Sequence, residues 1–302
     1  MLVFSAILVL GFLSSSAHAA PVPTYVSRTY PAQHFKGFVR TAKTEEFFLT
    51  APRKSFSSGD GPVPGTTSMR EKAGPVEDQG QCGSCWDFSL TSVLRGTWIM
   101  AGRDPGRLSF NYLLNCATDQ QGCNGGDFNA AAWFVHPKGV PSYGSDGEYT
   151  ESGGQCVSKP AVADAVAYHM LGAAGGSPSF RDIAYVVGVL HRPVSVDVAV
   201  DDNWEAYANG VYNLCTDQNI NDINHMVSVE GYDCETSVDA NGNCAFDAKG
   251  NLPPGVGTWL IRNSWGDSWG DSGYITTRAT SDSGQRCDMV GNDALYFDVS
   301  GE

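Results

Sequence analysis

One cysteine of this chain is placed where it could act as a nucleophile. Residues 79–90 contain turn-forming glycines up to Ser84, and the residues that follow are apolar at spacings that fit a buried helix. We therefore expect Cys85 in the first turn of that helix. The first N–H groups of a helix have no intrahelical partner, and the aligned peptide dipoles favour negative charge there. The thiol of Cys85 should then ionise more readily and react as a thiolate.

The sequence around Cys85 resembles the signature of the papain-like cysteine peptidases. Residues 82–86, Cys-Gly-Ser-Cys-Trp, match the pattern found around the cysteine of papain and the cathepsins, whose histidine and asparagine follow about 130 to 150 residues later. His225 falls within that interval. Asn263 begins an Asn-Ser-Trp-Gly run like that of the family but lies beyond the interval. Residues 233–257, rich in glycine, asparagine, aspartate and proline, would account for the excess as an insertion between two strands.

The resemblance implies a hydrolytic reaction with roles for several residues. Cys85 would attack a peptide carbonyl, and His225 would hold its proton as an imidazolium and later protonate the leaving amine. Asn263 would orient the imidazole, and Trp265 would shield their hydrogen bond from water. The side-chain amide of Gln79 and the backbone N–H of Cys85 would stabilise the oxyanion. The expected activity is that of a cysteine endopeptidase that forms an acyl-enzyme intermediate, without a cofactor or a metal.

Other residues are expected to bind the substrate. Gly83, Gly125 and Gly126 would let an extended peptide approach the wall of the cleft, because a Cβ would obstruct it. By resemblance, the pocket for the residue two before the scissile bond is formed by Asp127, Phe128, Asp197, Met226 and Asn292. Most relatives have apolar or aromatic residues in place of the two aspartates. These carboxylates would either widen the tolerance of the pocket toward lysine and arginine or face solvent.

A further departure from the family pattern is Asp87, where relatives usually have alanine. A carboxylate in the first turn suits the helix dipole. Two residues from Cys85, however, it could disfavour the thiolate. An inactive binding protein on a peptidase scaffold is therefore an alternative function.

The two parts of the chain that carry these residues predict different structures. Helices are expected from Cys85 onward, over residues 108–116, over residues 128–134, and over residues 179–190 with Ser177 or Ser179 as the cap. Short β-rich runs then predict an antiparallel sheet over residues 193–200, 226–232, 258–263, 273–278 and 294–299. The predicted fold class is α+β: by resemblance, a helical lobe (about 63–175) and a β-barrel-like lobe (about 176–302) with the active-site cleft between them.

The residues before this domain predict export and processing. Residues 1–19 have an apolar core and end in the small-residue site Ala17-His18-Ala19, which is typical of a signal peptide. Residues 20–62 are rich in aromatic and basic side chains, and the resemblance implies a short propeptide along the cleft. A mature N-terminal extension is the alternative. The protein is expected to be secreted, or delivered to a lysosome or vacuole.

Charge limits the partners of this 302-residue chain. A formal net charge of -14 and a pI near 4.7 argue against nucleic acid and anionic membranes, which require lysine and arginine patches. After the signal peptide, no apolar run reaches the length of a membrane helix. The expected partners are protein or peptide substrates, its own propeptide and cystatin-like inhibitors, and the expected state is a monomer.

Nine cysteines in an exported chain suggest four disulfides and one free thiol. The resemblance implies the pairs Cys82–Cys123, Cys116–Cys156 and Cys215–Cys287. This leaves Cys234 and Cys244 in the insertion, although spacing alone cannot establish connectivity. Cys82 and Cys85 also fit the Cys-x-x-Cys motif of a thiol-disulfide oxidoreductase, a more remote alternative. In the insertion, Asp239, Asn241, Asn243 and Asp247 resemble a calcium loop, but Gly242 is out of register with the EF-hand pattern.

Overall fold

The computed structural model describes residues 26–27, 34–216 and 219–301. The expected signal peptide, residues 1–19, lies outside the described residues.

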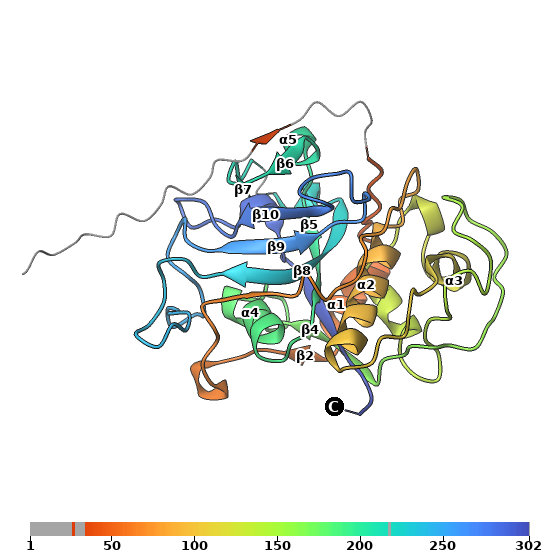
Figure 1. The fold of residues 1–302 in the computed structure, drawn as a ribbon, viewed down its shortest axis with the longest axis horizontal. Coiled ribbons are helices and arrows are strands. Elements are labelled where there is room, and N and C mark those ends of the chain that lie inside the picture. The colour runs from red at the N-terminus through yellow and green to blue at the C-terminus, as the bar shows by residue number, and fades with distance from the viewer. Residues whose placement is uncertain (1–25, 28–33, 217–218, 302) are drawn as a thin grey trace, which may run out of the picture.

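A mainly antiparallel sheet of nine strands organises one lobe of the molecule (Figure 1). The five β-rich runs predicted from the sequence are all strands of this sheet, and short strands from the N-terminal part of the chain join it. In order across the sheet, its strands are β2 (Arg53–Lys54), β4 (Ala167–Leu171), β11 (Ala294–Asp298), β5 (Val194–Val198), β8 (His225–Asp233), β9 (Thr258–Arg262), β10 (Tyr274–Arg278) and β7 (Val211–Tyr212), with β3 (Thr66–Ser68) paired to β8. A separate pair joins β1 (Val26–Ser27) to β6 (Tyr207–Asn209).

Helices cover the sheet and form the second lobe. The α-helices are α1 (Ala42–Thr50), α2 (Cys85–Met100), α3 (Phe110–Cys116), α4 (Phe180–Gly188) and α5 (Asp202–Glu205). Single 3₁₀ turns are η1 (Ser58–Asp60), η2 (Gly122–Asn124), η4 (Ile220–Asp222) and η5 (Cys287–Met289). Ser109 and Ser179 cap α3 and α4 by accepting backbone N–H groups of the first turn. The helix predicted over residues 128–134 is the 3₁₀ helix η3 (Phe128–Trp133).

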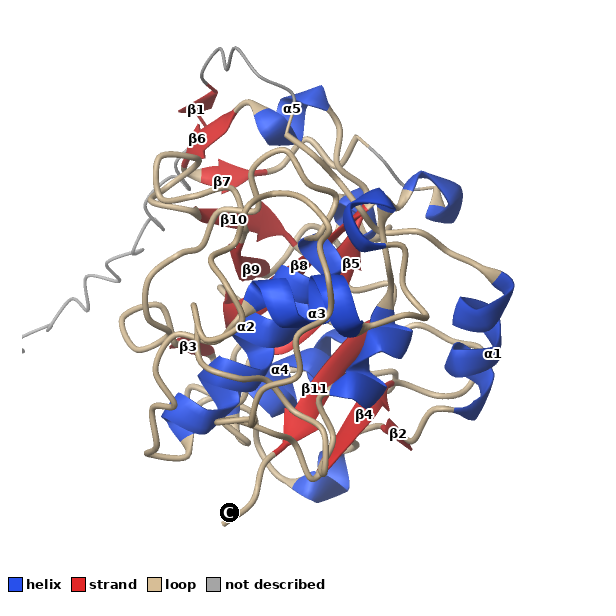
Figure 2. Ribbon diagram, turned by 90° about the vertical axis from the view of Figure 1, so that its right-hand side faces the viewer, coloured by secondary structure: helices blue, strands red, loops and turns tan. Residues whose placement is uncertain are grey.

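Two hydrophobic cores lie on either side of α2. One contains the aromatic and aliphatic side chains of the sheet lobe, such as Trp259 and Ile261. The other surrounds Trp86 and Leu90 of α2, and Phe297 of β11 packs into it. Figure 2 shows α2 and α3 in front of the sheet. Because β3 and β4 precede residue 175 and β11 contributes to the helical core, the expected division at that residue is only approximate.

Residues 34–40, here named the covering segment, run between the lobes. The N–H of Phe38 donates to the carbonyl of Asn224, just before β8, at 3.0 Å, and the N–H of Val39 donates to the carbonyl of Gly126 at 3.0 Å. The first contact is to the sheet lobe and the second to the helical lobe. In Figure 1 the red ribbon descends between the lobes before it enters α1.

In the described part of the chain, no helix is long and apolar enough to cross a membrane.

Candidate active site

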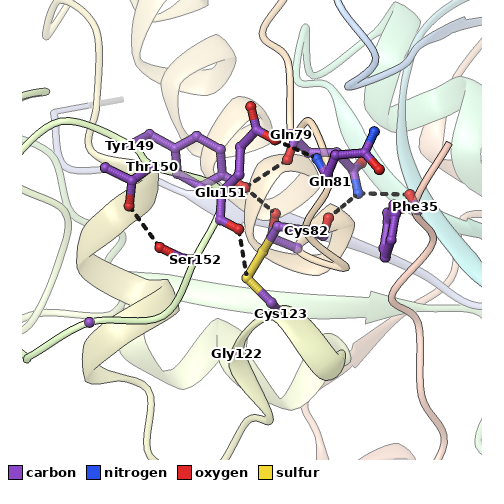
Figure 3. Close-up of a disulfide and its surroundings, with 12 residues drawn as sticks. Phe35, Gln79, Gln81, Cys82, Gly122, Cys123, Tyr149, Thr150, Glu151 and Ser152 are labelled. Carbon is purple, nitrogen blue, oxygen red and sulfur yellow. Dashed lines mark hydrogen bonds between the residues drawn. A yellow bond between two sulfur atoms is a disulfide. The ribbon is translucent and has the colours of Figure 1, made fainter.

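The cysteine expected as the nucleophile lies at the start of α2. Cys85 has no disulfide partner, whereas the other eight cysteines form the four pairs named above. Because Cys82 is bonded to Cys123, the alternative of a redox pair between Cys82 and Cys85 is wrong (Figure 3).

The thiol of Cys85 is completely buried beneath the covering segment. Burial raises the pKa of this thiol to about 12, although hydrogen bonding with the backbone of Met226 and Gly37 acts in the opposite direction. The easily ionised thiol expected from the helix terminus is therefore not found in this covered state. Desolvation outweighs the helix dipole here.

The imidazole of His225 lies at the first residue of β8, next to Met226. Its Nε2–H donates to Oδ1 of Asn263 at 2.8 Å, and the N–H of Ser264 donates to the same oxygen at 2.8 Å. Because Oδ1 only accepts, Nε2 carries the proton of the neutral ring and Nδ1 presents a lone pair. Nδ1 is buried and has no hydrogen-bond partner among the described residues. It is thus the nitrogen left for a proton from Cys85.

Burial also affects the charge of this ring. It lowers the pKa of His225 to about 3, against the opposing effect of the hydrogen bond to Asn263. A thiol with a raised pKa and an imidazole with a lowered pKa are both neutral near pH 7. The covered site therefore holds the uncharged pair, and the ion pair expected from the resemblance requires water to reach it.

Trp265 covers the hydrogen bond between His225 and Asn263. Its ring stacks on His225 with centroids 4.9 Å apart, and Trp269 meets it edge to face at 5.0 Å. His34 of the covering segment stacks on Trp265 at 4.4 Å. Trp265 is 2% exposed, so water is kept from the hydrogen bond on this side.

The amide of Gln79 points toward the cleft because Ser264 orients it. The hydroxyl of Ser264 donates to Oε1 of Gln79 at 2.6 Å, which leaves the Nε2 hydrogens as donors. They bond to the carbonyls of Phe35 and Cys82, each at 2.9 Å (Figure 3). A carbonyl of the covering segment thus lies where the resemblance implies a substrate carbonyl. The positioning by Ser264 was missed in the sequence, although Ser264 belongs to the Asn-Ser-Trp-Gly run that was singled out.

Glycines on the helical lobe permit close approach of the covering segment. The N–H of Gly126 donates to the carbonyl of Gly37 at 2.8 Å. A Cβ on Gly83 would lie 2.9 Å from the carbonyl oxygen of Lys36, and one on Gly125 would lie 2.9 Å from that of Gly37. The three glycines predicted to bind an extended peptide therefore line the path of this one.

The predicted specificity pocket is only partly as expected. Phe128 and Met226 are fully buried, and the ring of Phe38 meets that of Phe128 edge to face at 6.0 Å. Asp127 caps η3 by accepting the N–H of Asn129 at 2.7 Å, and it also accepts the hydroxyl of Thr44 at 2.5 Å. Its carboxylate is thus engaged in holding helices η3 and α1.

Asp197 is fully buried, so the alternative in which both aspartates face solvent is wrong in this state. Its Oδ1 accepts the N–H of Asp293 at 2.7 Å. Nη2 of Arg40 contacts Oδ2 of Asp293 and lies 3.7 Å from Oδ2 of Asp197. Asn292 donates to Asp293 at 3.0 Å. The sequence did not point to Asp293 or Arg40, which come together only through the fold.

Asp87 lies in the interior of the helical lobe. It is fully buried and accepts the hydroxyl of Thr91 at 2.9 Å, while Oδ2 has no partner among the described residues. Burial raises the pKa of Asp87 well above its usual value, which favours the neutral carboxyl. The expected electrostatic conflict with the thiolate is therefore weaker than an ionised Asp87 would produce.

The insertion is a loop closed by the Cys234–Cys244 disulfide. Oδ1 of Asp239 accepts the N–H groups of Asn241 and Asn243, and Oδ1 of Asp247 accepts those of Lys249 and Asn251. These oxygens thus form local turns. Within the described ranges, no three His, Cys, Asp or Glu side chains are grouped to hold a metal ion.

Comparison with known proteins agrees with this geometry. The chain is 34% identical over 219 residues to the oryzain gamma chain of Oryza sativa subsp. japonica, which covers 70% of this chain and 54% of that protein. The chain thus spans about half the length of this curated relative, as it does for the vignain of Vigna mungo, at 54%.

Solved structures share the fold. Procathepsin L2 from the larval midgut of Tenebrio molitor has a TM-score of 0.69 at 24% identity, over 88% of this chain and 78% of that one. Bromelain from Ananas comosus, solved in complex with the E64 inhibitor, has a TM-score of 0.61 at 28% identity, over 79% of this chain and 100% of that one. The fold is therefore the α+β papain-like fold with two lobes.

The sequence profile of the family described as papain family cysteine protease matches residues 63–296. This match includes α2, β8 and the Asn-Ser-Trp-Gly run. The chain belongs to the papain family of cysteine proteases.

Proposed function

We propose that this protein, once processed, is a cysteine endopeptidase. One observation carries the proposal: the single free cysteine lies at the head of α2, against the backbone of the residue that follows His225. An inactive binding protein would not need the accompanying hydrogen bonds of His225 to Asn263 and of Gln79 to Ser264.

The mechanism follows from the hydrogen-bond directions. Nδ1 of His225 takes the proton of Cys85, and the sulfur attacks the carbonyl carbon of the scissile peptide bond. The oxygen that becomes negative is stabilised by Nε2–H of Gln79 and the backbone N–H of Cys85. Collapse of this intermediate breaks the C–N bond, and the imidazolium gives its proton to the leaving amine. Water then hydrolyses the acyl-enzyme and regenerates the thiol.

Residues 20–62 are proposed as the propeptide. The covering segment buries Cys85 and occupies the glycine-lined path, so this part of the chain has to leave before a substrate can bind. Residues 57–60 are exposed, which makes them accessible to a processing cut. Residues 1–19 are proposed as a signal peptide, and the protein as secreted, or lysosomal or vacuolar. Its partners would be protein substrates, its propeptide and cystatin-like inhibitors, and its state a monomer.

The test compares the processed protein with a Cys85→Ser variant. An unfolded protein such as casein should be cleaved at internal bonds by the wild type only, and E64 should stop the cleavage. N-terminal sequencing of the processed form locates the cut. Binding of the protein substrate without any cleavage by the processed wild type would favour the binding protein instead.

A further inference from the structure

Arg40 of the covering segment fills an acidic position at the end of the cleft. Its Nη2 contacts Oδ2 of Asp293 and lies 3.7 Å from Oδ2 of Asp197. The guanidinium carbon also lies 5.0 Å from the centre of the Phe48 ring. An arginine side chain thus already occupies a site with two carboxylates, whereas Phe48, like Arg40, belongs to the proposed propeptide.

Hydrogen bonds from one backbone N–H and one side-chain amide hold the two carboxylates in place independently of Arg40. The N–H of Asp293 donates to Asp197 at 2.7 Å, and the side chain of Asn292 donates to Asp293 at 3.0 Å. These three residues lie outside the covering segment and remain when it leaves. The site is therefore built into the sheet lobe.

The nearby permanent cation does not replace Arg40. Arg286 is partly buried and close enough to influence both carboxylates. Its terminal nitrogens, however, donate to the main-chain carbonyls of Val290 and Pro178, each at 2.8 Å.

Burial, and after it the neighbouring Asp293, raises the pKa of Asp197 well above its usual value, and burial also raises the pKa of Asp293. Departure of Arg40 therefore favours a protonated carboxyl in this pair. A guanidinium or ammonium group that enters the pocket would favour the ionised carboxylate and pair with it, as Arg40 does.

There is an apolar approach and room for a side chain. Phe128 and Met226 are fully buried beside the path of the covering segment, and Phe38 contacts Phe128. A cavity of about 220 Å³ lies against Ser177, Asn292 and Asp293, and its remaining wall includes Arg40 and Phe48 of the proposed propeptide. Departure of the propeptide would open this space further. An arginine or lysine can lay its alkyl stem along apolar surface while its charged end reaches the carboxylates.

We propose that Asp293, together with Asp197, selects substrates with arginine or lysine at the second residue before the scissile bond, whose side chain enters this pocket. In the precursor, Arg40 occupies the same site. This inference rests on the proposed endopeptidase function. It assigns to Asp293 the role that the sequence suggested for Asp127, whose carboxylate is engaged with Thr44 and the backbone of η3.

The test uses the processed protein and fluorogenic peptides that differ only at the second residue before the scissile bond, which is arginine or norleucine. Norleucine keeps an unbranched alkyl chain and removes the charge. We expect kcat/KM to be at least about tenfold higher for arginine, because a charged hydrogen bond contributes more than about 1.4 kcal/mol when its partner is buried. Asp293→Asn should reduce this ratio about tenfold, whereas Asp282→Asn, at an exposed carboxylate, should leave it unchanged.

A ratio near one for the wild-type protein would overturn the inference and leave the endopeptidase intact. The second measurement does not depend on turnover or on the folding of Asp293→Asn. Calorimetry on a processed Cys85→Ala protein should find the arginine peptide bound at least about tenfold more tightly than the norleucine peptide. Equal affinity would also overturn the inference, even if no peptide is hydrolysed. Absence of hydrolysis together with selective binding would contradict only the proposed catalysis.

Discussion

The covering segment contacts the two ends of the cleft in different ways. At the Cys85 end, its contacts to the helical lobe and to Gln79 involve backbone groups: the carbonyls of Phe35, Lys36 and Gly37. At the carboxylate end, where Phe38 and Val39 also make backbone hydrogen bonds, it adds side-chain contacts: the ring of Phe38 and the guanidinium of Arg40. Backbone groups are common to every peptide, whereas these side chains are not.

This difference separates chemistry from selectivity. Changes at the Cys85 end should reduce hydrolysis of all substrates alike, because every substrate presents the same carbonyl there. Changes at the carboxylate end should alter the ranking of substrates. The following predictions are ordered from the largest effect to the smallest.

Replacement of His225 should have the largest effect. His225→Ala removes the group that accepts the proton of Cys85 and protonates the leaving amine, so kcat/KM should fall by roughly 10⁴-fold or more for arginine and norleucine peptides alike. His191→Ala, at an exposed histidine, is the matched control and should be near wild type. A loss confined to one peptide would mean that His225 acts in selectivity.

Processing should change the reactivity of the single free thiol. In the precursor, burial raises the pKa of Cys85 to about 12, so thiolate is scarce at neutral pH and iodoacetamide reacts slowly. Because the pKa of Cys85 is raised, the alkylation rate should keep rising with pH beyond the pH at which an ordinary cysteine is fully ionised. After processing, the rate at neutral pH should increase by on the order of 100-fold or more. A Cys85→Ser precursor should take up no label.

Equal alkylation rates before and after processing would show that the covering segment does not shield the thiol.

Loss of the Gln79 amide should reduce catalysis less than loss of His225. Gln79→Ala removes one oxyanion donor and should lower kcat by about 100- to 1000-fold, whereas Gln81→Ala, an exposed neighbour, should have little effect. Ser264→Ala leaves the amide in place but removes the 2.6 Å hydrogen bond that orients it. We expect a loss of roughly tenfold in kcat. A larger loss in Ser264→Ala than in Gln79→Ala would contradict this order.

Asp87→Asn should have the smallest effect. Burial already favours the neutral carboxyl of Asp87, and an amide of the same shape keeps an acceptor for Thr91. The processed variant should keep kcat/KM within about threefold of wild type and an unchanged pH profile. A shift of the acidic limb by about one pH unit would instead mean that Asp87 is ionised next to Cys85.

Local sequence patterns were sufficient to predict the helix and strands that position the residues at the Cys85 end of the cleft. The change from glycines to helix-spaced apolar residues predicted a helix from Cys85. The β-rich runs predicted β8, which begins at His225, and β9, which ends immediately before Asn263. The composition of residues 233–257 was enough to explain the long spacing. These features are determined by residues that lie close together in the sequence.

Contacts between residues far apart in the sequence could not be predicted from local patterns. Arg40 and Asp293 meet only because the covering segment crosses the cleft, and Ser264 reaches Gln79 only because the lobes close on one another. The burial of Asp87 and the raised pKa of Cys85 likewise depend on what covers them. No local pattern encodes such covering groups.

Mass mapping of the adduct formed with E64 tests the central assignment most directly. The processed protein should gain one E64 molecule, carried by the peptide that contains Cys85, and its hydrolytic activity should fall in proportion to labelling. A fully processed protein that cleaves peptides while Cys85 stays unlabelled, or whose adduct lies on another residue, would contradict the assignment of Cys85 as the nucleophile.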